Sequence, residues 1–389
     1  MLRRTLMIAT VPLVVLATAP ALAQEVVKIG AVLPLTGGQA AVGVQIQAAM
    51  KLFMAKNGAT AGGKKIDLII KDDASVPDNS KRLAQELIVN ERVGVVVSAL
   101  TPSAMAVGPL STQGKTANVV VVSGTSAVIN PNNPYMVRTS FTLGQQSKVI
   151  AEWAAKNGSK KVVIVQSDWA PGAEATAVFT DSFTKAGGQV AETIKVPLQN
   201  PDFAPFLQRA RDLSPDTLFV FVPAGQAGPF AKQFAERGLD KAGVKLIGPG
   251  DITDDNDLPG MGDAMLGVVT AGFYSALHDS PMNKDYVAAF KTANNFRPNF
   301  ISVGGWDGMH LIYEGLKKTS GKTDGPALID AMKGTKWESP RGPISIDPDT
   351  REIVQNVYLR KVEKVQGELY NVEFATVEAV KDPLKAAKQ

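Results

Sequence analysis

Short runs of aliphatic and β-branched residues alternate with amphipathic helical stretches along almost the whole chain. Runs such as VVIV at 162–165 and NVVVV at 118–122 are typical of parallel strands buried on both faces. A representative helix is predicted at 43–57 and ends at Asn57-Gly58. The alternation predicts an α/β fold. Strands are predicted at residues 26–33, 66–71, 93–98, 119–122, 161–166, 190–196, 217–222 and 244–247.

A weak internal repeat indicates two similar halves. The dipeptide Pro-Asp precedes a predicted helix at residue 77 and again at residue 201, an offset of 124 (201 − 77). The strands that follow these helices begin at residues 93 and 217, which are also 124 apart. A chain of this length is expected to form two domains. We therefore predict two equivalent α/β lobes.

The first 23 residues have the pattern of a cleaved signal peptide. Arg3 and Arg4 precede an apolar core at 6–16, and Ala21-Leu22-Ala23 supplies a small-x-small cleavage site before Gln24. The core is shorter than the roughly 20 residues that a membrane-spanning helix needs. No cysteine follows the cleavage site, so a lipid anchor is not expected. The sequence predicts a protein exported to the periplasm.

Composition argues against several classes of function. Removal of the leader takes away two arginines and lowers the net charge from +4 to +2, which gives no basis for binding nucleic acid or a membrane surface. The chain has no cysteine and only two histidines, so no metal site, cofactor or catalytic triad is expected. Residues 108–116 and 254–257 imitate a phosphate-binding loop and a calcium loop, but both have the wrong spacing. We expect no enzyme activity.

One continuous segment carries a family resemblance. Residues 28–77 read KIGAVLPLTGGQAAVGVQIQAAMKLFMAKNGATAGGKKIDLIIKDDASVP: a strand, a Gly-rich loop, a helix, a second strand and an acidic turn. This segment resembles the start of the type I periplasmic solute-binding proteins of the leucine/isoleucine/valine-binding family. The resemblance implies two doubly wound parallel-sheet lobes joined by a three-strand hinge. It also implies a monomer that delivers a small carboxylate ligand to the permease and ATPase of an ABC importer.

The resemblance further implies that each lobe is discontinuous. The chain is expected to cross between lobes near 139–143, 270–275 and 343–349. Lobe 1 would then comprise residues 24–141 and 275–345, and lobe 2 residues 142–274 and 346–389. The C-terminal part is predicted to contain helices at 282–294, 303–318 and 325–333, strands around 344–346 and 356–362, and a frayed tail from 382.

The strongest candidate for a ligand site follows the NVVVV strand. In open parallel sheets, ligands bind beyond the carboxyl ends of the strands, and small residues there let backbone amides approach an anion. Gly124, Thr125 and Ser126 fit this pattern, and Ser103 lies near the start of the next helix upstream. The resemblance implies that these residues hold the ligand carboxylate. The alternative is that Ser103 only caps its helix and that 123–126 is an ordinary turn.

Other candidates surround the same predicted cleft. Trp169 follows a strand and would stack on a ligand, or else cover the core. Tyr274 lies near an expected crossing, and Gln226 would close over the ligand from lobe 2. Asp251 comes one residue after the position where the family carries an acid for the ligand ammonium. Val42 stands where amino-acid-binding members often have an aromatic residue.

These departures leave two ligands open. The carboxylate half of the expected pocket is present, whereas its ammonium half is altered, as is position 171, where proline replaces a frequent tyrosine. A branched-chain or related amino acid held by Asp251 is the first interpretation. An aromatic or other non-amino acid stacked on Trp169 is the second. A ligand sensor of the same fold and an exported enzyme are the alternatives of another class.

Overall fold

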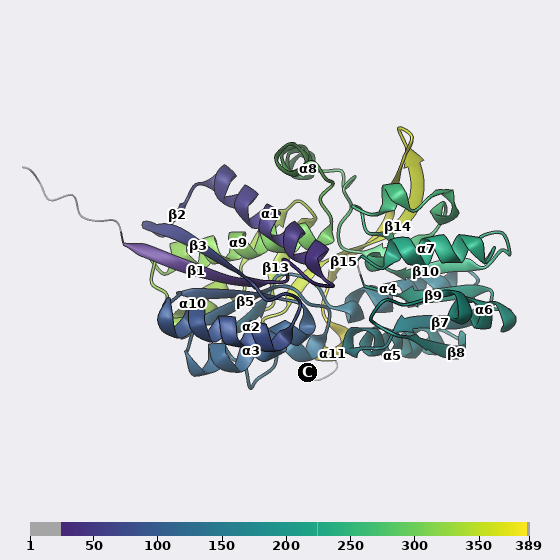
Figure 1. The fold of residues 1–389 in the computed structure, drawn as a ribbon, viewed down its shortest axis with the longest axis horizontal. Helices are drawn as coiled ribbons and strands as arrows, with labels where there is room; N and C mark the ends of the chain where they lie inside the picture. Colours follow the sequence, from purple (N-terminus) through teal and green to yellow (C-terminus); the bar gives the residue numbers. More distant parts are fainter. Residues whose placement is uncertain (1–24, 224, 387–389) are drawn as a thin grey trace, which may run out of the picture.

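The computed structural model describes residues 25–223 and 225–386, which form two lobes lying side by side along the long axis (Figure 1). The predicted signal peptide and its cleavage site fall outside the described residues. Each lobe contains a sheet made mainly of parallel strands, with helices packed against it. The α/β fold with two lobes predicted from the sequence is confirmed.

The first lobe is built on a six-stranded sheet in the order β2-β3-β1-β4-β5-β6. Its strands are β1 (Val26–Leu33), β2 (Thr60–Ala61), β3 (Lys64–Asp72), β4 (Val95–Ala99), β5 (Ala117–Val122) and β6 (Met136–Arg138). Its helices are α1 (Ala40–Asn57), α2 (Pro77–Gln85), α3 (Thr101–Gln113), α8 (Pro281–Asn294), α9 (Phe300–Lys318) and α10 (Gly325–Met332), with short helical turns at Glu86–Asn90 and Ser126–Val128.

The second lobe is built on a nine-stranded sheet in the order β12-β13-β14-β11-β10-β9-β7-β8, with β15 paired to β14. Its strands are β7 (Lys161–Ser167), β8 (Gln189–Val196), β9 (Thr217–Phe221), β10 (Lys245–Pro249), β11 (Val269–Gly272), β12 (Lys336–Ser339), β13 (Gly342–Ile346), β14 (Ile353–Val365) and β15 (Glu368–Val380). Its helices are α4 (Leu143–Lys156), α5 (Ala170–Lys185), α6 (Ala204–Asp212), α7 (Ala227–Glu236) and α11 (Pro383–Ala386), with short turns at Gly250–Thr253, Leu258–Gly260 and Asp263–Met265.

The parallel parts of the two sheets have the same topology. In the first lobe the order β3-β1-β4-β5-β6 places the first strand second, and β8-β7-β9-β10-β11 repeats this arrangement in the second lobe. Strand order therefore reverses beside β1 and beside β7. Such reversal points are where ligands bind in open α/β sheets, beyond the carboxyl ends of the strands.

The central strands β4 and β5 of the first lobe are buried at every position and are mostly valine. Alternate valines of β4 and β5 (Val95, Val97, Val119 and Val121) belong to the core beneath α1 and α9, whereas Val96 packs with α2 and α3. Helix α9 approaches β5 so closely that a Cβ on Gly304 would lie 2.1 Å from the Val121 carbonyl oxygen. This close packing fixes the strand ends that border the cleft.

The chain passes between the sheets through three segments. Residues 139–142 link β6 to α4, and residues 273–280 link β11 to α8, close to two of the expected crossings. At the third, β12 pairs with β13, and β13 pairs with β14 of the second sheet from Ile344 onward. Trp337 of β12 nevertheless donates a hydrogen bond to Asp307 of α9 in lobe 1. The β12–β13 hairpin thus bridges the lobes, and the exact lobe boundaries stay a prediction.

Candidate ligand-binding site

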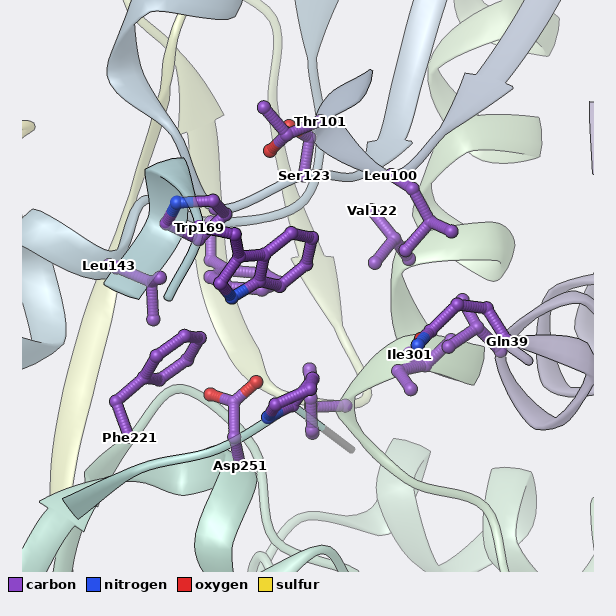
Figure 2. A pocket seen from close by; sticks show the side chains of 16 residues that line it. Gln39, Leu100, Thr101, Val122, Ser123, Leu143, Trp169, Phe221, Asp251 and Ile301 are labelled. Atoms are coloured by element: carbon purple, nitrogen blue, oxygen red, sulfur yellow. The ribbon is translucent and has the colours of Figure 1, made fainter. Parts of the chain in front are cut away.

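A cavity lies between the lobes, beyond the carboxyl ends of the central strands (Figure 2). Both lobes supply its walls, most of which are apolar or aromatic. The lining residues are Gln39, Val42, Leu100, Thr101, Val122, Ser123, Gly124, Phe141, Leu143, Trp169, Pro171, Phe221, Pro223, Asp251, Phe300 and Ile301.

The lobe 1 end of the cavity is suited to an anion, although no cationic side chain is among the described residues that line it. Thr101 is the first residue of α3, so the amino end of a thirteen-residue helix borders the cavity and its dipole favours negative charge. The Thr101 hydroxyl lies 2.9 Å from the Ser123 hydroxyl, which follows β5. Leu100, just before the helix, has a positive φ of 63°, an uncommon conformation for a branched residue. The strained turn aims the start of α3 at the cavity.

The loop after β5 is held from behind by Arg138. This fully buried guanidinium donates to the carbonyl oxygens of Ser123 and Thr125, the latter at 2.7 Å, and its Nε donates to Glu352 at 2.7 Å. Burial raises the pKa of Glu352 to about 7, although the Arg138 charge opposes the shift. Arg138 does not line the cavity. It therefore fixes the loop but is not available to a ligand.

The lobe 2 end of the cavity presents a single carboxyl group. Asp251 lies in the helical turn after β10, and its side chain points into the cavity (Figure 2). It is only 6% exposed, and burial raises its pKa to about 7. Its Oδ2 has no hydrogen-bond partner within the described part of the chain. Among the described residues that line the cavity, Asp251 is the one ionisable side chain.

Trp169 supplies a large aromatic surface and a polar edge. It precedes α5, and its indole projects into the cavity toward the side from which Asp251 enters (Figure 2). The indole Nε1 is buried and has no hydrogen-bond partner among the described residues. Phe141, Phe221 and Phe300 complete the apolar walls. The cavity can thus hold a flat ring between aromatic side chains.

Four of the nine predicted site residues line this cavity. They are Val42 from α1, Gly124 after β5, Trp169 before α5 and Asp251 after β10, so both lobes contribute. Gly124 is required by close packing, because a Cβ there would lie 2.8 Å from the Leu143 side chain. The structure brings these four residues together around one space; their contact with a ligand stays a prediction.

The other five predicted residues lie outside the lining. The Ser103 hydroxyl donates to Asp73 at 3.2 Å and accepts from Ser80 at 2.9 Å, so it faces α2. Thr125 accepts hydrogen bonds from Thr101 and, at its carbonyl, from Arg138.

Ser126, Gln226 and Tyr274 are similarly engaged by other parts of the chain. The Gln226 amide donates to the carbonyl oxygen of Leu198, and the Tyr274 carbonyl accepts from Arg360. The Tyr274 side chain is completely buried. Ser126 donates its amide and hydroxyl to Glu174, a carboxylate of the protein itself. None of these three residues lines the cavity, and their contact with a ligand stays a prediction.

Sequence reasoning missed several lining residues. Thr101 and Ser123 lie two or three residues before Ser103 and Ser126, which the sequence favoured. For Ser103 the reason is helical geometry, because the first residue of α3 faces its amino end whereas the third turns aside. Phe221, Phe300 and Ile301 gave no signal in the sequence, since apolar residues at strand ends and helix starts are usually core.

Within residues 25–223 and 225–386 there is no group of three or more His, Asp or Glu side chains placed to hold a metal ion. In the same residues, no helix combines the length and apolar character needed to cross a bilayer.

The two hinged lobes and the cavity between strand tips define a binding protein that encloses a small molecule. The family model for periplasmic binding proteins matches residues 26–367. The chain therefore belongs to the periplasmic binding protein family, as the resemblance implied.

Individual relatives agree with this assignment. The Leu/Ile/Val-binding protein homolog 6 of Brucella abortus is 42% identical over 369 residues, covering 93% of this chain and 94% of the relative. A solute-binding protein of an ABC transporter from Rhodopseudomonas palustris BisB5, solved with 3,4-dihydroxybenzoic acid, is 61% identical with a TM-score of 0.91, covering 93% and 100%. A second one, from R. palustris HaA2 with p-hydroxybenzoic acid, is 39% identical with a TM-score of 0.89, covering 94% and 100%.

Proposed function

We propose that this protein captures a hydroxylated aromatic carboxylic acid between its lobes and presents it to the permease and ATPase of an ABC importer. The observation that carries the proposal is the polarity of the cavity: neutral donors at one end, aromatic walls between, and one buried carboxyl at the other. The solved relatives with dihydroxybenzoic and hydroxybenzoic acid support the same ligand class. The sequence had placed this class second, after a branched-chain amino acid.

The carboxylate of the ligand belongs at the lobe 1 end. The Ser123 hydroxyl offers a hydrogen bond there and the amino end of α3 a favourable dipole, while Thr101 can add a second hydrogen bond by releasing Thr125. Placing the carboxylate at the other end would set it against Asp251, another acid in a buried site. Like charges at close range in a buried site are strongly disfavoured. The orientation of the ligand follows from this asymmetry.

A hydroxyl group on the ring suits the lobe 2 end. A hydroxyl can donate to Asp251 and at the same time accept from the indole N–H of Trp169. An ammonium group donates only, so it would leave the Trp169 N–H unpaired. An unsubstituted ring would leave both groups unpaired, and each buried unpaired polar group costs about 1–3 kcal/mol. Selection for a hydroxylated ligand follows from this cost.

Closure of the lobes would couple binding to transport. The cavity walls come from both lobes, so a ligand makes all its contacts only when the lobes are together. Such a ligand shifts the population toward the closed form by differential contact. We expect the protein, as a monomer in the periplasm, to present its closed form to a membrane permease. It would then release the ligand chemically unaltered.

A branched-chain amino acid is the second candidate, and Asp251 is the observation that favours it. An ionised Asp251 would pair with the ligand ammonium, and the Brucella relative is named for leucine, isoleucine and valine. Because burial raises the pKa of Asp251 to about 7, binding of an ammonium would weaken as the pH falls below that value. A ring hydroxyl can hydrogen bond to either protonation state of Asp251.

Calorimetric titration of protein unfolded and refolded to remove bound ligand tests the proposal. The ligands are 3,4-dihydroxybenzoate, 4-hydroxybenzoate, benzoate and leucine. We expect the hydroxylated acids to bind at least about tenfold more tightly than benzoate, and leucine to bind least. Asp251→Asn should reduce the preference for the hydroxyl, whereas the exposed control Asp181→Asn should not. Tighter binding of leucine than of any benzoate would refute the proposal.

A further inference from the structure

An internal carboxylate joins the two lobes beside the cavity. Glu174 of α5, in lobe 2, accepts the Ser126 amide with both oxygens at 3.0 Å and the Ser126 hydroxyl at 2.9 Å. Ser126 begins the helical turn that follows the anion-binding loop of lobe 1. Burial raises the pKa of Glu174, and the hydrogen bonds from Ser126 oppose the shift. These bonds therefore run between lobes and next to the ligand site.

We propose that Glu174 is a positioning residue whose carboxylate draws lobe 2 onto the loop of lobe 1, so that ligand retention depends on a side chain outside the cavity lining. Hydrogen bonds to an ionised acceptor are stronger than bonds between neutral groups. The same contact occupies the Ser126 amide. It confines the ligand carboxylate to the side of the loop formed by Ser123 and Thr101.

Both partners are positioned within their own lobes. Helix α5 is anchored in lobe 2 by Phe179, which is fully buried and stacks on Phe219 of β9 with ring centroids 4.1 Å apart. The loop that precedes Ser126 is fixed in lobe 1 by Arg138, which donates to the Thr125 carbonyl. Neither lobe needs the Glu174 contact to keep its own core. The contact consequently bears on the distance between lobes, and loss of it should leave each lobe folded.

The absence of cysteine in the sequence makes a direct distance measurement practical. Lys56→Cys on α1 and Lys232→Cys on α7 place one exposed label on each lobe, and energy transfer between two dyes reports closure. The Glu174→Ala and Ser126→Ala variants, alone and combined, are compared in this background. Asp181→Asn on the same helix, with an exposed carboxylate, is the matched control.

Without ligand, we expect Glu174→Ala to shift the population toward longer interlobe distances, while Asp181→Asn leaves it unchanged. With 3,4-dihydroxybenzoate as the probe, Glu174→Ala should raise Kd about tenfold, mainly through faster dissociation. Adding Ser126→Ala to Glu174→Ala should have little further effect, because the two residues act through one contact. Glu174→Gln, which keeps one acceptor oxygen, should be intermediate and guards against misfolding of the alanine variant.

Unchanged interlobe distances in both Glu174 variants would overturn the inference, as would fully additive effects of the two alanine substitutions. Failure of 3,4-dihydroxybenzoate to bind the parent protein would instead count against the proposed ligand. The ligand-free distance measurement would then still decide the role of Glu174.

Discussion

Replacing Asp251 by Asn should stabilise the ligand-free protein at high pH, and it should weaken the binding of a hydroxylated aromatic acid. The side chain is 6% exposed and one carboxyl oxygen lacks a partner among the described residues. Burial disfavours the charged form and raises the pKa from an ordinary 3.8 to about 7. In the unfolded chain the group regains its ordinary pKa. Between these two values the folded state binds more protons than the unfolded state, so stability falls as the pH rises.

The size of this effect follows from the two pKa values. A span from 3.8 to about 7 corresponds to a loss of about 4 kcal/mol of unfolding free energy at pH above both values. Below pH 3.8 the carboxyl is protonated in both states and nothing is lost. Asparagine carries no charge at any pH, so it avoids the loss, but its buried amide costs about 1–3 kcal/mol at every pH. The variant should therefore gain about 4 kcal/mol relative to the parent between pH 4 and pH 8.

Urea denaturation of ligand-free parent and variant at pH 4, 6 and 8 measures this gain. The quantity to compare is the difference in unfolding free energy between the two proteins at each pH, in which other titrating groups cancel. Asp181→Asn, which removes a solvent-exposed carboxylate from α5, is the matched control. If the Asp251→Asn difference is flat between pH 4 and pH 8, the carboxyl is not buried as described, and its role in the cavity must be reconsidered.

Trp169→Phe keeps an aromatic wall but removes the indole N–H, so titration should show hydroxylated acids binding about fivefold more weakly and benzoate unchanged. Arg138→Met leaves Glu352 buried without its partner and should lower the unfolding free energy by about 3–5 kcal/mol in denaturant. Adding Glu352→Gln should recover part of that loss; no recovery would show that the pair is not coupled. Gly304→Ala forces a Cβ to 2.1 Å from the Val121 oxygen and should cost about 1–3 kcal/mol, measured as a lower Tm; an unchanged Tm would show that α9 can shift.

Much of the fold was readable because local pattern and tertiary role agree. The strand predicted at 26–33 is β1 with the same bounds, and the strand predicted at 161–166 is one residue longer as β7. Both are internal strands that are mostly buried, and the run VVIV in β7 is typical of a strand buried on two faces. The 124-residue offset likewise corresponds to the shared strand order of the two sheets. These predicted features depend on contacts between adjacent strands of one sheet.

The C-terminal part was less readable because its strands are partly exposed. No strand was predicted for β15 (Glu368–Val380). The C-terminal half of this strand is mostly solvent-exposed, and the strand pairs only with β14. The expected crossing at 343–349 relied on family resemblance, whereas β13 pairs with β14 of the second sheet from Ile344 onward. Helix α11 (Pro383–Ala386) forms where a frayed tail was expected. Pairing at a sheet edge depends on distant partners, which local patterns do not specify.

Prediction of the binding site from the sequence was limited for the same reason. The sequence predicts that the residues after β5 hold the carboxylate of a ligand, and in the structure Ser126 donates to a carboxylate of the protein. That carboxylate is Glu174, 48 residues further along and on the other lobe. A turn rich in small residues indicates that an anion fits, but it does not indicate whether the anion is a ligand or the protein itself.

Two buried carboxyl groups therefore have opposite effects on the free energy of lobe closure. Glu174 gains three hydrogen bonds when the lobes meet, whereas Asp251 loses hydration there and gains no partner for its Oδ2 among the described residues. A ligand that donates a hydrogen bond to Asp251 removes the unfavourable contribution of Asp251 and leaves the favourable contribution of Glu174. A ligand of the right polarity therefore stabilises the closed form further, whereas an apolar ring would enclose Asp251 without giving it a hydrogen bond. Selectivity and closure thus have a common physical origin in the burial of one carboxyl group.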